Sequence, residues 1–212
     1  MIQTKIVAVS KGHRGTPGSN TGAVGIDGLS EFNIVTIVGN AALERLAQMG
    51  IPAVEVPRTR VPFRLKFVAD LFRREPKPEA VALIDIHANA FNRAEACGTE
   101  TFVSTPGSKS HPLATFVNRA VVSTLSKYDL SWVDRGVKTQ RFLVFSKALA
   151  RAVGIKGYDF DRRYFACLLE IGFITNPEDA SVLTCRKALL DVGHAIVEGV
   201  AEWRLAYDTS RS

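Results

Sequence analysis

The sequence predicts an α/β fold, in which a single domain holds a mostly parallel, twisted sheet of about six strands flanked by helices. Three observations lead to this prediction. Short apolar runs alternate with helical patterns along the 212 residues. No segment rich in Pro, Gly or Ser divides the chain, so residues 1–212 are expected to form one domain. The composition, 46% hydrophobic and 23% charged, is typical of a packed globular protein and argues against disorder or a coiled coil.

The predicted strands are short apolar stretches rich in Val, Ile and Phe, a composition that favours extended structure. In chain order they are residues 5–9, 53–56, 80–86, 99–103, 141–145 and 165–171. Because helical segments separate most of these strands, most connections would be crossovers between parallel neighbours.

The clearest predicted helix begins at Ser30, a good N-cap residue, and ends before Gly50. Its apolar residues recur every three or four positions and would face the core: Val35, Val38, Ala42, Leu46 and Met49. Two further helices are predicted near residues 62–73, burying Phe63, Phe67 and Leu71, and near residues 112–126, burying Leu113, Phe116, Ala120 and Leu125. Asn176 and Pro177 begin a short helix, and residues 187–207 form the last one, with Leu189, Ile196, Val200 and Trp203 inward.

Several classes of protein are disfavoured by simple features. The most apolar run, residues 80–91, is interrupted by Asp85 and His87 and is shorter than the about 18 residues of a membrane span. The first residues lack the apolar core of a signal peptide, so we expect synthesis in the cytoplasm without one. Three cysteines, none in a Cys-x-x-Cys pair, argue against a disulfide framework. The net charge of +6 is compatible with an acidic partner, such as nucleic acid or an anionic wall polymer, and equally with a merely basic surface.

Two of the four histidines follow predicted strands directly. His13 comes after the first strand, between Gly12 and Arg14, and His87 comes after the third. Ligands of parallel sheets bind beyond the carboxyl ends of the strands, so both imidazoles are expected at one edge of the sheet. Either could also be a polar loop residue. His111, at a helix start, and His194, on the last helix, are expected to be surface or packing residues and not ligands.

Two carboxylates are candidates for chemistry. Glu31 opens its predicted helix, where a negative charge also complements the helix dipole. Glu170 interrupts a run that otherwise reads as a buried strand. Burial of a carboxylate is costly unless it has a cation or a chemical role, and it raises the pKa toward that of a useful base.

Two imidazoles and one carboxylate suit a zinc ion whose fourth position is left for water. His13, Glu31 and His87 would supply the three ligands, and Glu170 a separate proton acceptor. The proposed ligands are separated by 18 and 56 residues and do not form a short motif.

Seven segments follow one another along the chain: Gly12-His13-Arg14-Gly15 with Gly22-Ala23, Leu29-Ser30-Glu31-Phe32-Asn33, Arg58-Thr59-Arg60, Ile86-His87-Ala88-Asn89-Ala90, Gly98-Thr99-Glu100-Thr101-Phe102, Asp134-Arg135-Gly136-Val137-Lys138 and Leu168 to Asn176. In this order they resemble the motifs of the zinc-dependent N-acetylmuramoyl-L-alanine amidases of the amidase-3 type. The resemblance implies one zinc ion per chain on His13, Glu31 and His87, with Glu170 as the catalytic carboxylate. We further expect Asn89 to contact substrate.

The implied reaction cuts peptidoglycan between muramic acid and the first alanine of the stem peptide, with Glu170 moving the proton from the attacking water to the leaving nitrogen. The resemblance also implies one catalytic amidase domain over residues 1–212, acting on the cell wall as an endolysin or another lysis enzyme. A sporulation enzyme fits similarly. Alternatives are a zinc peptidase of related architecture and a metal-free basic binding module, although no interleaving of basic and aromatic residues favours nucleic acid.

Three departures from the family pattern stand out. Ser10-Lys11 replaces the usual Asp-Pro before Gly-His, and Asp85 replaces a usual Ser. Asp85 could accept a hydrogen bond from a histidine ligand. Residues 146–164 form a longer segment with Arg151, Arg162 and Arg163, which could be a substrate lip, a regulatory cover or a tolerated surface insertion.

Overall fold

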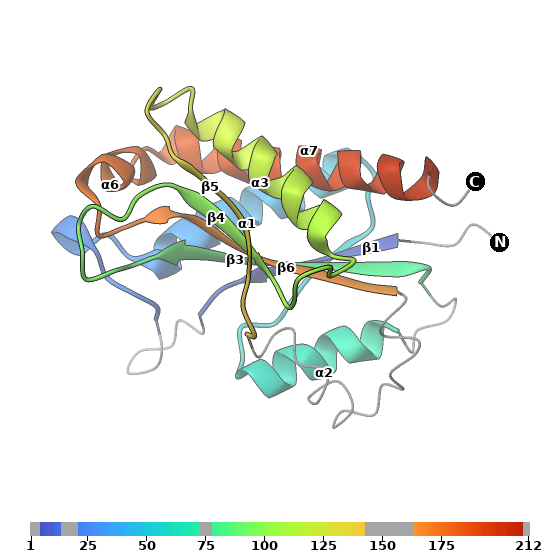
Figure 1. Ribbon diagram of the computed structural model, residues 1–212. Coiled ribbons are helices and arrows are strands. Elements are labelled where there is room, and N and C mark those ends of the chain that lie inside the picture. Colours follow the sequence, from blue (N-terminus) through green and yellow to red (C-terminus); the bar gives the residue numbers. More distant parts are fainter. Residues whose placement is uncertain (1–4, 14–20, 73–77, 143–162, 210–212) are drawn as a thin grey trace.

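Six strands form one sheet in the order β2-β1-β3-β6-β4-β5 (Figure 1). The computed structural model describes residues 5–13, 21–72, 78–142 and 163–209. The strands are β1 (Lys5–Lys11), β2 (Ala53–Glu55), β3 (Ala80–Asn89), β4 (Thr99–Val103), β5 (Asp134–Thr139) and β6 (Tyr164–Phe173). β1, β2, β3 and β6 are parallel, whereas β4 is antiparallel to β6 and parallel to β5. The predicted α/β fold with a mostly parallel sheet is confirmed.

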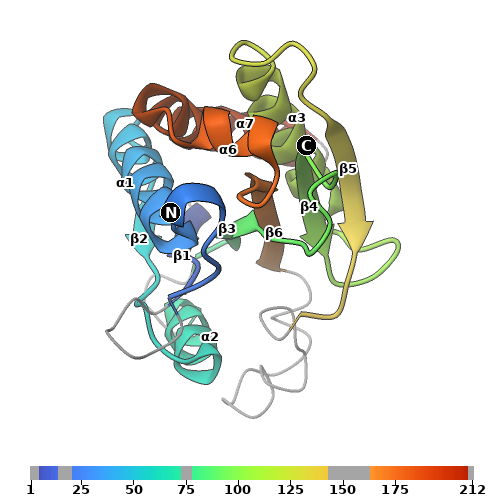
Figure 2. The ribbon, with the colours of Figure 1, turned by 90° about the vertical axis from the view of Figure 1, so that its left-hand side faces the viewer.

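The helices cover the two faces of the sheet unequally. α1 (Glu31–Gln48), α3 (His111–Leu125) and α7 (Arg186–Thr209) pack on one face, and α2 (Val61–Leu71) lies on the other (Figures 1 and 2). A 3-10 turn (Ile26–Gly28) precedes α1, and α6 (Pro177–Leu183) follows β6. Among the described residues, no helix is long and apolar enough to cross a membrane.

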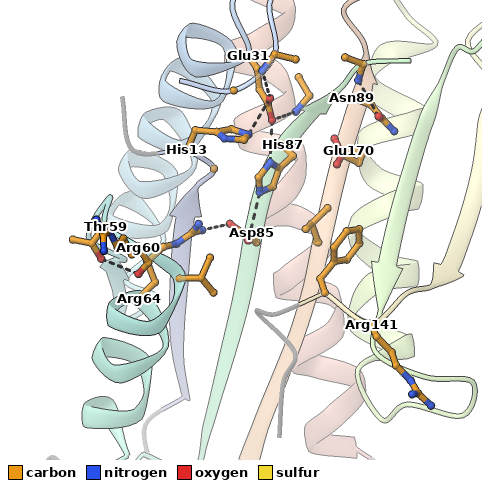
Figure 3. A pocket seen from close by; sticks show the side chains of 18 residues that line it. His13, Glu31, Thr59, Arg60, Arg64, Asp85, His87, Asn89, Arg141 and Glu170 are labelled. Carbon is orange, nitrogen blue, oxygen red and sulfur yellow. Dashed lines mark hydrogen bonds and ion pairs between the residues drawn. The ribbon is translucent and has the colours of Figure 1, made fainter. Parts of the chain in front are cut away.

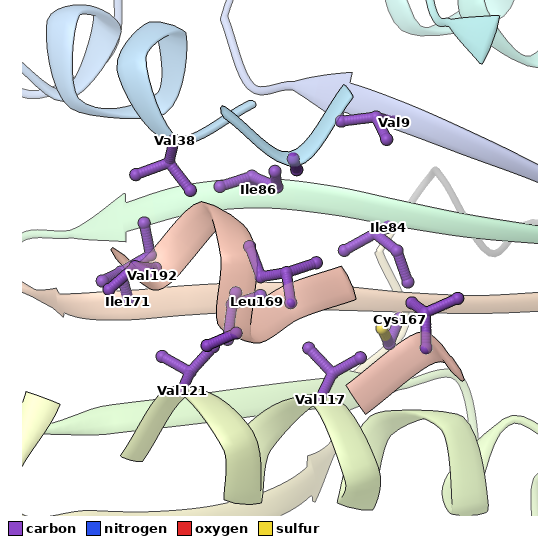
Figure 4. Close-up of a cluster of buried hydrophobic side chains, with 14 of the residues drawn as sticks. Val9, Val38, Ile84, Ile86, Val117, Val121, Cys167, Leu169, Ile171 and Val192 are labelled. Carbon is purple, nitrogen blue, oxygen red and sulfur yellow. The ribbon is translucent and has the colours of Figure 1, made fainter. Parts of the chain in front are cut away.

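The larger core fills the space between the sheet and the helices α1, α3 and α7 (Figure 4). Ile86 and Leu169, from the two central strands, are fully buried there, and burial of each such side chain stabilises the fold by about 1.5–3 kcal/mol. Gly193 lets α7 approach α1, because a Cβ at this position would lie 2.6 Å from the Cβ of Ala41. Leu189, Ile196, Val200 and Trp203 of α7 are buried as predicted.

The smaller core lies under α2, where Val68 and Leu71 pack toward Leu83 and Leu168 of the sheet. Side chains alternate between the faces of a strand, so the next residue of β3 on this face is Asp85, followed by His87 and Asn89. On this face the apolar residues near the strand starts thus give way to polar residues near the carboxyl ends. The polar residues line a pocket.

The predicted strand at residues 141–145 is wrong for Arg141 and Phe142, its two described residues. The sixth strand is β5, which ends at Thr139; Arg141 and Phe142 lie beyond it, and residues 143–145 are outside the described residues. β5 is a polar edge strand with a single neighbour, so it lacks the apolar run of a buried strand. Phe142 packs against the core without belonging to a strand, because its ring lies edge-on against Phe102.

Two expected core residues are exposed. Phe63 at the start of α2 is 62% exposed, and the helix instead buries Leu65, Val68, Ala69 and Leu71. Met49 is 38% exposed because it lies just past the end of α1. Phe67, Phe116 and Ala120 are partly buried against the two cores. The predicted cap of α6 is confirmed, since the side chain of Asn176 accepts a hydrogen bond from the backbone N–H of Asp179. Of the predicted insertion at residues 146–164, residues 146–162 are outside the described residues.

Candidate active site

A cluster of two histidines and one glutamate lies at the carboxyl ends of β1 and β3 (Figure 3). His13 follows β1, Glu31 is the first residue of α1, and His87 lies near the end of β3. The Oε2 atom of Glu31 is 3.0 Å from Nε2 of His13, and its Oε1 atom is 2.9 Å from Nδ1 of His87. One donor atom from each residue lies within 4.8 Å of the other two. The structure thus brings together the three predicted ligands.

The carboxylate of Glu31 is fixed from several directions. It accepts backbone hydrogen bonds from Ala23 at 2.9 Å and from Ala88 at 3.3 Å. Gly22 has a φ of +83°, and a Cβ there would lie 2.6 Å from Oε2 of Glu31 and 2.7 Å from Cδ2 of His13. Only glycine fits this close approach without displacing the cluster. The chain therefore builds a tight cradle around the three donor groups.

The electrostatics of the cluster favour a charged carboxylate. Burial alone would raise the pKa of Glu31, but hydrogen bonds with His13 and His87 lower this pKa to about 2. Burial alone would lower the pKa of His87, but Asp85 and Glu31 raise it to about 10. The positive charge of His87 and the negative charges of Glu31 and Asp85 therefore stabilise one another. Imidazole nitrogen and carboxylate oxygen are also the ligands that zinc prefers, so this donor set fits a zinc ion.

Glu170 reaches the same pocket from β6. In the sheet register it is paired with His87 on one side and with Glu100 on the other. Its Oε2 atom is buried and has no hydrogen-bond partner among the described residues. Burial raises the pKa of Glu170 to about 8. This carboxyl group therefore binds a proton more tightly than an exposed glutamate does.

The pocket has a volume of about 880 Å³, and Asn89 lines it together with the His/Glu cluster. The Nδ2 group of Asn89 donates to Oε1 of Glu100 at 2.8 Å, and its Oδ1 atom accepts from the backbone N–H of Ala90. His111 and His194 are exposed on α3 and α7 and do not line this pocket.

Two groups of polar contacts around the pocket were not predicted, although several of their residues lie in the segments quoted for the family resemblance. Arg64 of α2 and Ser10 of β1 both contact Asp85, and together with His87 they lower the pKa of this buried carboxyl group to about 2, against the effect of burial. Arg135 and Lys138 of β5 contact Glu100 of β4. No spacing rule connects these partners, since they come from different elements. The signal in the sequence was Asp85, a carboxylate within an otherwise apolar strand, which indicated that a buried partner was needed.

The comparisons with known proteins agree with this geometry. The model of the Amidase_3 family, described as N-acetylmuramoyl-L-alanine amidase, matches residues 7–202, and the chain belongs to this family. Hydrolysis of the peptidoglycan amide bond is the activity that family membership supports. The uncharacterized protein YqiI of Bacillus subtilis (strain 168) is 29% identical over 201 residues, which cover 94% of this chain and 84% of the relative.

Solved structures share the fold. The N-acetylmuramoyl-L-alanine amidase AmiC2 of Nostoc punctiforme is similar with a TM-score of 0.74 and 23% identity, over 94% of this chain and 97% of that one. The catalytic domain of CwlV, an N-acetylmuramoyl-L-alanine amidase from Bacillus (Paenibacillus) polymyxa var. colistinus, has a TM-score of 0.72 and 22% identity, over 94% and 98% of the two chains. At this identity the likeness concerns the arrangement of the sheet and helices.

Proposed function

We propose that this protein is a zinc-dependent N-acetylmuramoyl-L-alanine amidase, whose one zinc ion is held by His13, Glu31 and His87. The observation that carries the proposal is the convergence of these three donors, within 4.8 Å of one another, in a pocket that also holds Glu170, whose buried Oε2 atom has no hydrogen-bond partner in the described part of the chain. Family membership supplies the substrate class, and the cradle around Glu31 supports the ligand set.

Zinc bound there would supply Lewis acidity at the scissile carbonyl and lower the pKa of water. The carboxylate of Glu170 accepts a proton from the attacking water and delivers it to the nitrogen of the leaving alanine. Because Oε2 of Glu170 has no hydrogen bond among the described residues, this atom is free to hold that proton. Asn89 keeps one Nδ2 hydrogen beyond its bond to Glu100, and this hydrogen is available to a substrate carbonyl.

The role in lysis, as an endolysin or another lysis enzyme acting on the cell wall, remains part of this proposal. So does the assignment of residues 1–212 to one catalytic domain. The pocket of about 880 Å³ is large enough for a sugar with part of its peptide, which supports a peptidoglycan fragment as substrate.

The test uses the purified full chain, stripped of metal and reloaded with zinc, and a soluble muramyl peptide. We expect one zinc ion per chain, and mass spectrometry should find a free stem peptide with an amino-terminal alanine. His87→Ala should lose both zinc and activity. The matched control His111→Ala, an exposed histidine outside the pocket, should keep both.

Three results would contradict the proposal. Zinc binding of less than about half an equivalent after loading would remove the metal. Cleavage inside the stem peptide would instead indicate a zinc peptidase. Binding to sacculi that weakens with salt, without any hydrolysis, would indicate a basic binding module.

A further inference from the structure

A second layer of polar groups lies behind His87. Asp85 is on the same face of β3, two positions earlier, and is 2% exposed. Its Oδ2 atom lies 3.5 Å from Nε2 of His87, on the side of the ring opposite the contact between Nδ1 and Glu31. The imidazole of His87 is therefore placed between two carboxylates, one at each nitrogen (Figure 3).

The other oxygen of Asp85 is held by two further elements. Ser10, its register partner on β1, donates from Oγ to Oδ1 at 2.6 Å. Arg64, which reaches across from α2, donates from Nη2 to the same Oδ1 atom and also contacts Ser10. The side chains of Arg64 and Asp85 are 13% and 3% exposed. A buried ion pair of this kind is held more firmly than a surface pair, since water competes little for either charge.

We propose that Arg64 is a positioning residue which acts through Asp85 to fix the ring of His87. This inference rests on the proposed function, because its consequence is at the zinc ligand. With Oδ1 occupied by Arg64 and Ser10, Oδ2 of Asp85 faces Nε2 of His87 at 3.5 Å and favours the tautomer that carries its proton on Nε2. The lone pair of Nδ1 then points toward Glu31, where the metal would bind.

A purely structural role would look different. If Arg64 only fastened α2 to the sheet, its removal would lower stability and leave the ligand ring unchanged. The residue at position 85 also separates the two roles. A serine at this position would have no charge for an arginine to hold, so the link from α2 to the ligand depends on the carboxylate of Asp85.

The experiment measures zinc affinity of the full chain by competition with a chromogenic chelator. We expect Asp85→Asn to weaken zinc binding about 10–100-fold and Arg64→Gln about tenfold, which is typical of residues that orient a ligand. Lys66→Gln is the matched control, because Lys66 lies on the same helix, is 58% exposed and pairs with Asp70 on the surface. This control should bind zinc as the wild type does.

A double substitution tests whether Arg64 acts through Asp85. In an Asp85→Ser background, Arg64→Gln should cause no further loss of zinc affinity. NMR of the zinc-loaded protein gives a second readout: the Nε2–H proton of His87 should exchange slowly with water in the wild type and rapidly in Arg64→Gln. Arg64→Lys keeps the charge and should restore part of both effects. Should Arg64→Gln fail to fold, Arg64→Lys and the double variant decide the question.

The outcomes separate this inference from the proposed function. A wild-type chain that binds no zinc would overturn both. A wild-type chain that binds zinc, together with an Arg64→Gln variant of equal affinity and equally slow Nε2–H exchange, would overturn the positioning role alone. A further loss on adding Arg64→Gln to Asp85→Ser would also overturn it, since Arg64 would then act by another route.

Discussion

Glu100 and Glu170 lie opposite each other on the antiparallel strands β4 and β6, yet their surroundings differ. Glu100 is 5% exposed and fully occupied: Oε1 accepts from Asn89 at 2.8 Å, and Oε2 accepts from Arg135 at 2.7 Å and from Lys138. The buried Oε2 atom of Glu170 has no such partner in the part of the chain that the structure describes. Burial raises the pKa of both groups, but Arg135 and Lys138 reverse the shift for Glu100.

The difference follows from the order of the strands. Arg135 and Lys138 come from the edge strand β5, which pairs with β4 and not with β6. Their charges therefore neutralise the nearer glutamate, and Glu170 is left facing the histidine cluster. The two residues share a register position on neighbouring strands, so their different partners distinguish the structural carboxylate from the one available for proton transfer.

The largest expected effect concerns activity. Glu170→Gln should lower the rate of amide hydrolysis by about 10²–10⁴-fold while zinc binding and fold are kept, because the general base is lost. Glu100→Gln makes the same chemical change on the neighbouring strand and should reduce activity less than tenfold. Hydrolysis of a soluble muramyl peptide measures both. A Glu170→Gln variant within tenfold of the wild type would contradict the role, and loss of zinc in this variant would make Glu170 a ligand.

The second effect concerns stability, for which the two residues should have opposite signs. The folded-state pKa of Glu100 is below 4.5, so its stabilising contribution is present at neutral pH and is lost as the pH falls through the folded value. Glu100→Gln should therefore reduce the free energy of unfolding at neutral pH by about 1–3 kcal/mol, since hydrogen bonds to a charged group are lost. The deficit should shrink in acid.

For Glu170 the sign is reversed. Its folded-state pKa of about 8 exceeds the ordinary 4.5, so between these values the unfolded chain releases a proton that the folded chain retains. Stability of the metal-free protein is then lost as the pH rises through this range. Glu170→Gln should stabilise the metal-free protein at neutral pH, because glutamine has no proton to lose as the pH rises. Urea unfolding at several pH values tests both residues, and equal signs would contradict the comparison.

The sequence predicts the parts of this molecule that depend on local patterns. β3 and β6 are long apolar runs interrupted by carboxylates, and both were located from their apolar residues. Ser30 was correctly placed at the N-cap of α1 from its residue type. The ligand candidates were predicted because parallel strands place their carboxyl ends at one edge, and the structure brings them into one pocket.

The parts that were missed depend on contacts between distant segments. β5 reads as polar because it lies at the sheet edge, and its Arg135 and Lys138 gain meaning only from Glu100, more than 30 residues away. Arg64 reads as one of several charges on an amphipathic helix until α2 packs over Asp85. Phe63 fits the helical spacing, yet it is exposed, and α2 instead buries Leu65 and Val68. The spacing of apolar residues predicts which face of a helix or strand is buried, but it does not predict which other element packs against that face.

The smallest expected effect divides the partners of Glu100. The side chain of Lys138 is 38% exposed, whereas that of Arg135 is 31% exposed and also lies over the ring of Phe173. Lys138→Gln should therefore lower the free energy of unfolding by only about 0.5 kcal/mol, the size of a partly solvated ion pair. Arg135→Gln should cost more, since it loses both the ion pair and the packing on the aromatic ring. Denaturant unfolding at low and high salt measures both, and salt should reduce the contribution of Lys138 more strongly. If Lys138→Gln cost as much as Glu100→Gln, one lysine would account for the whole difference between the two glutamates, and the edge strand would act through a single charge.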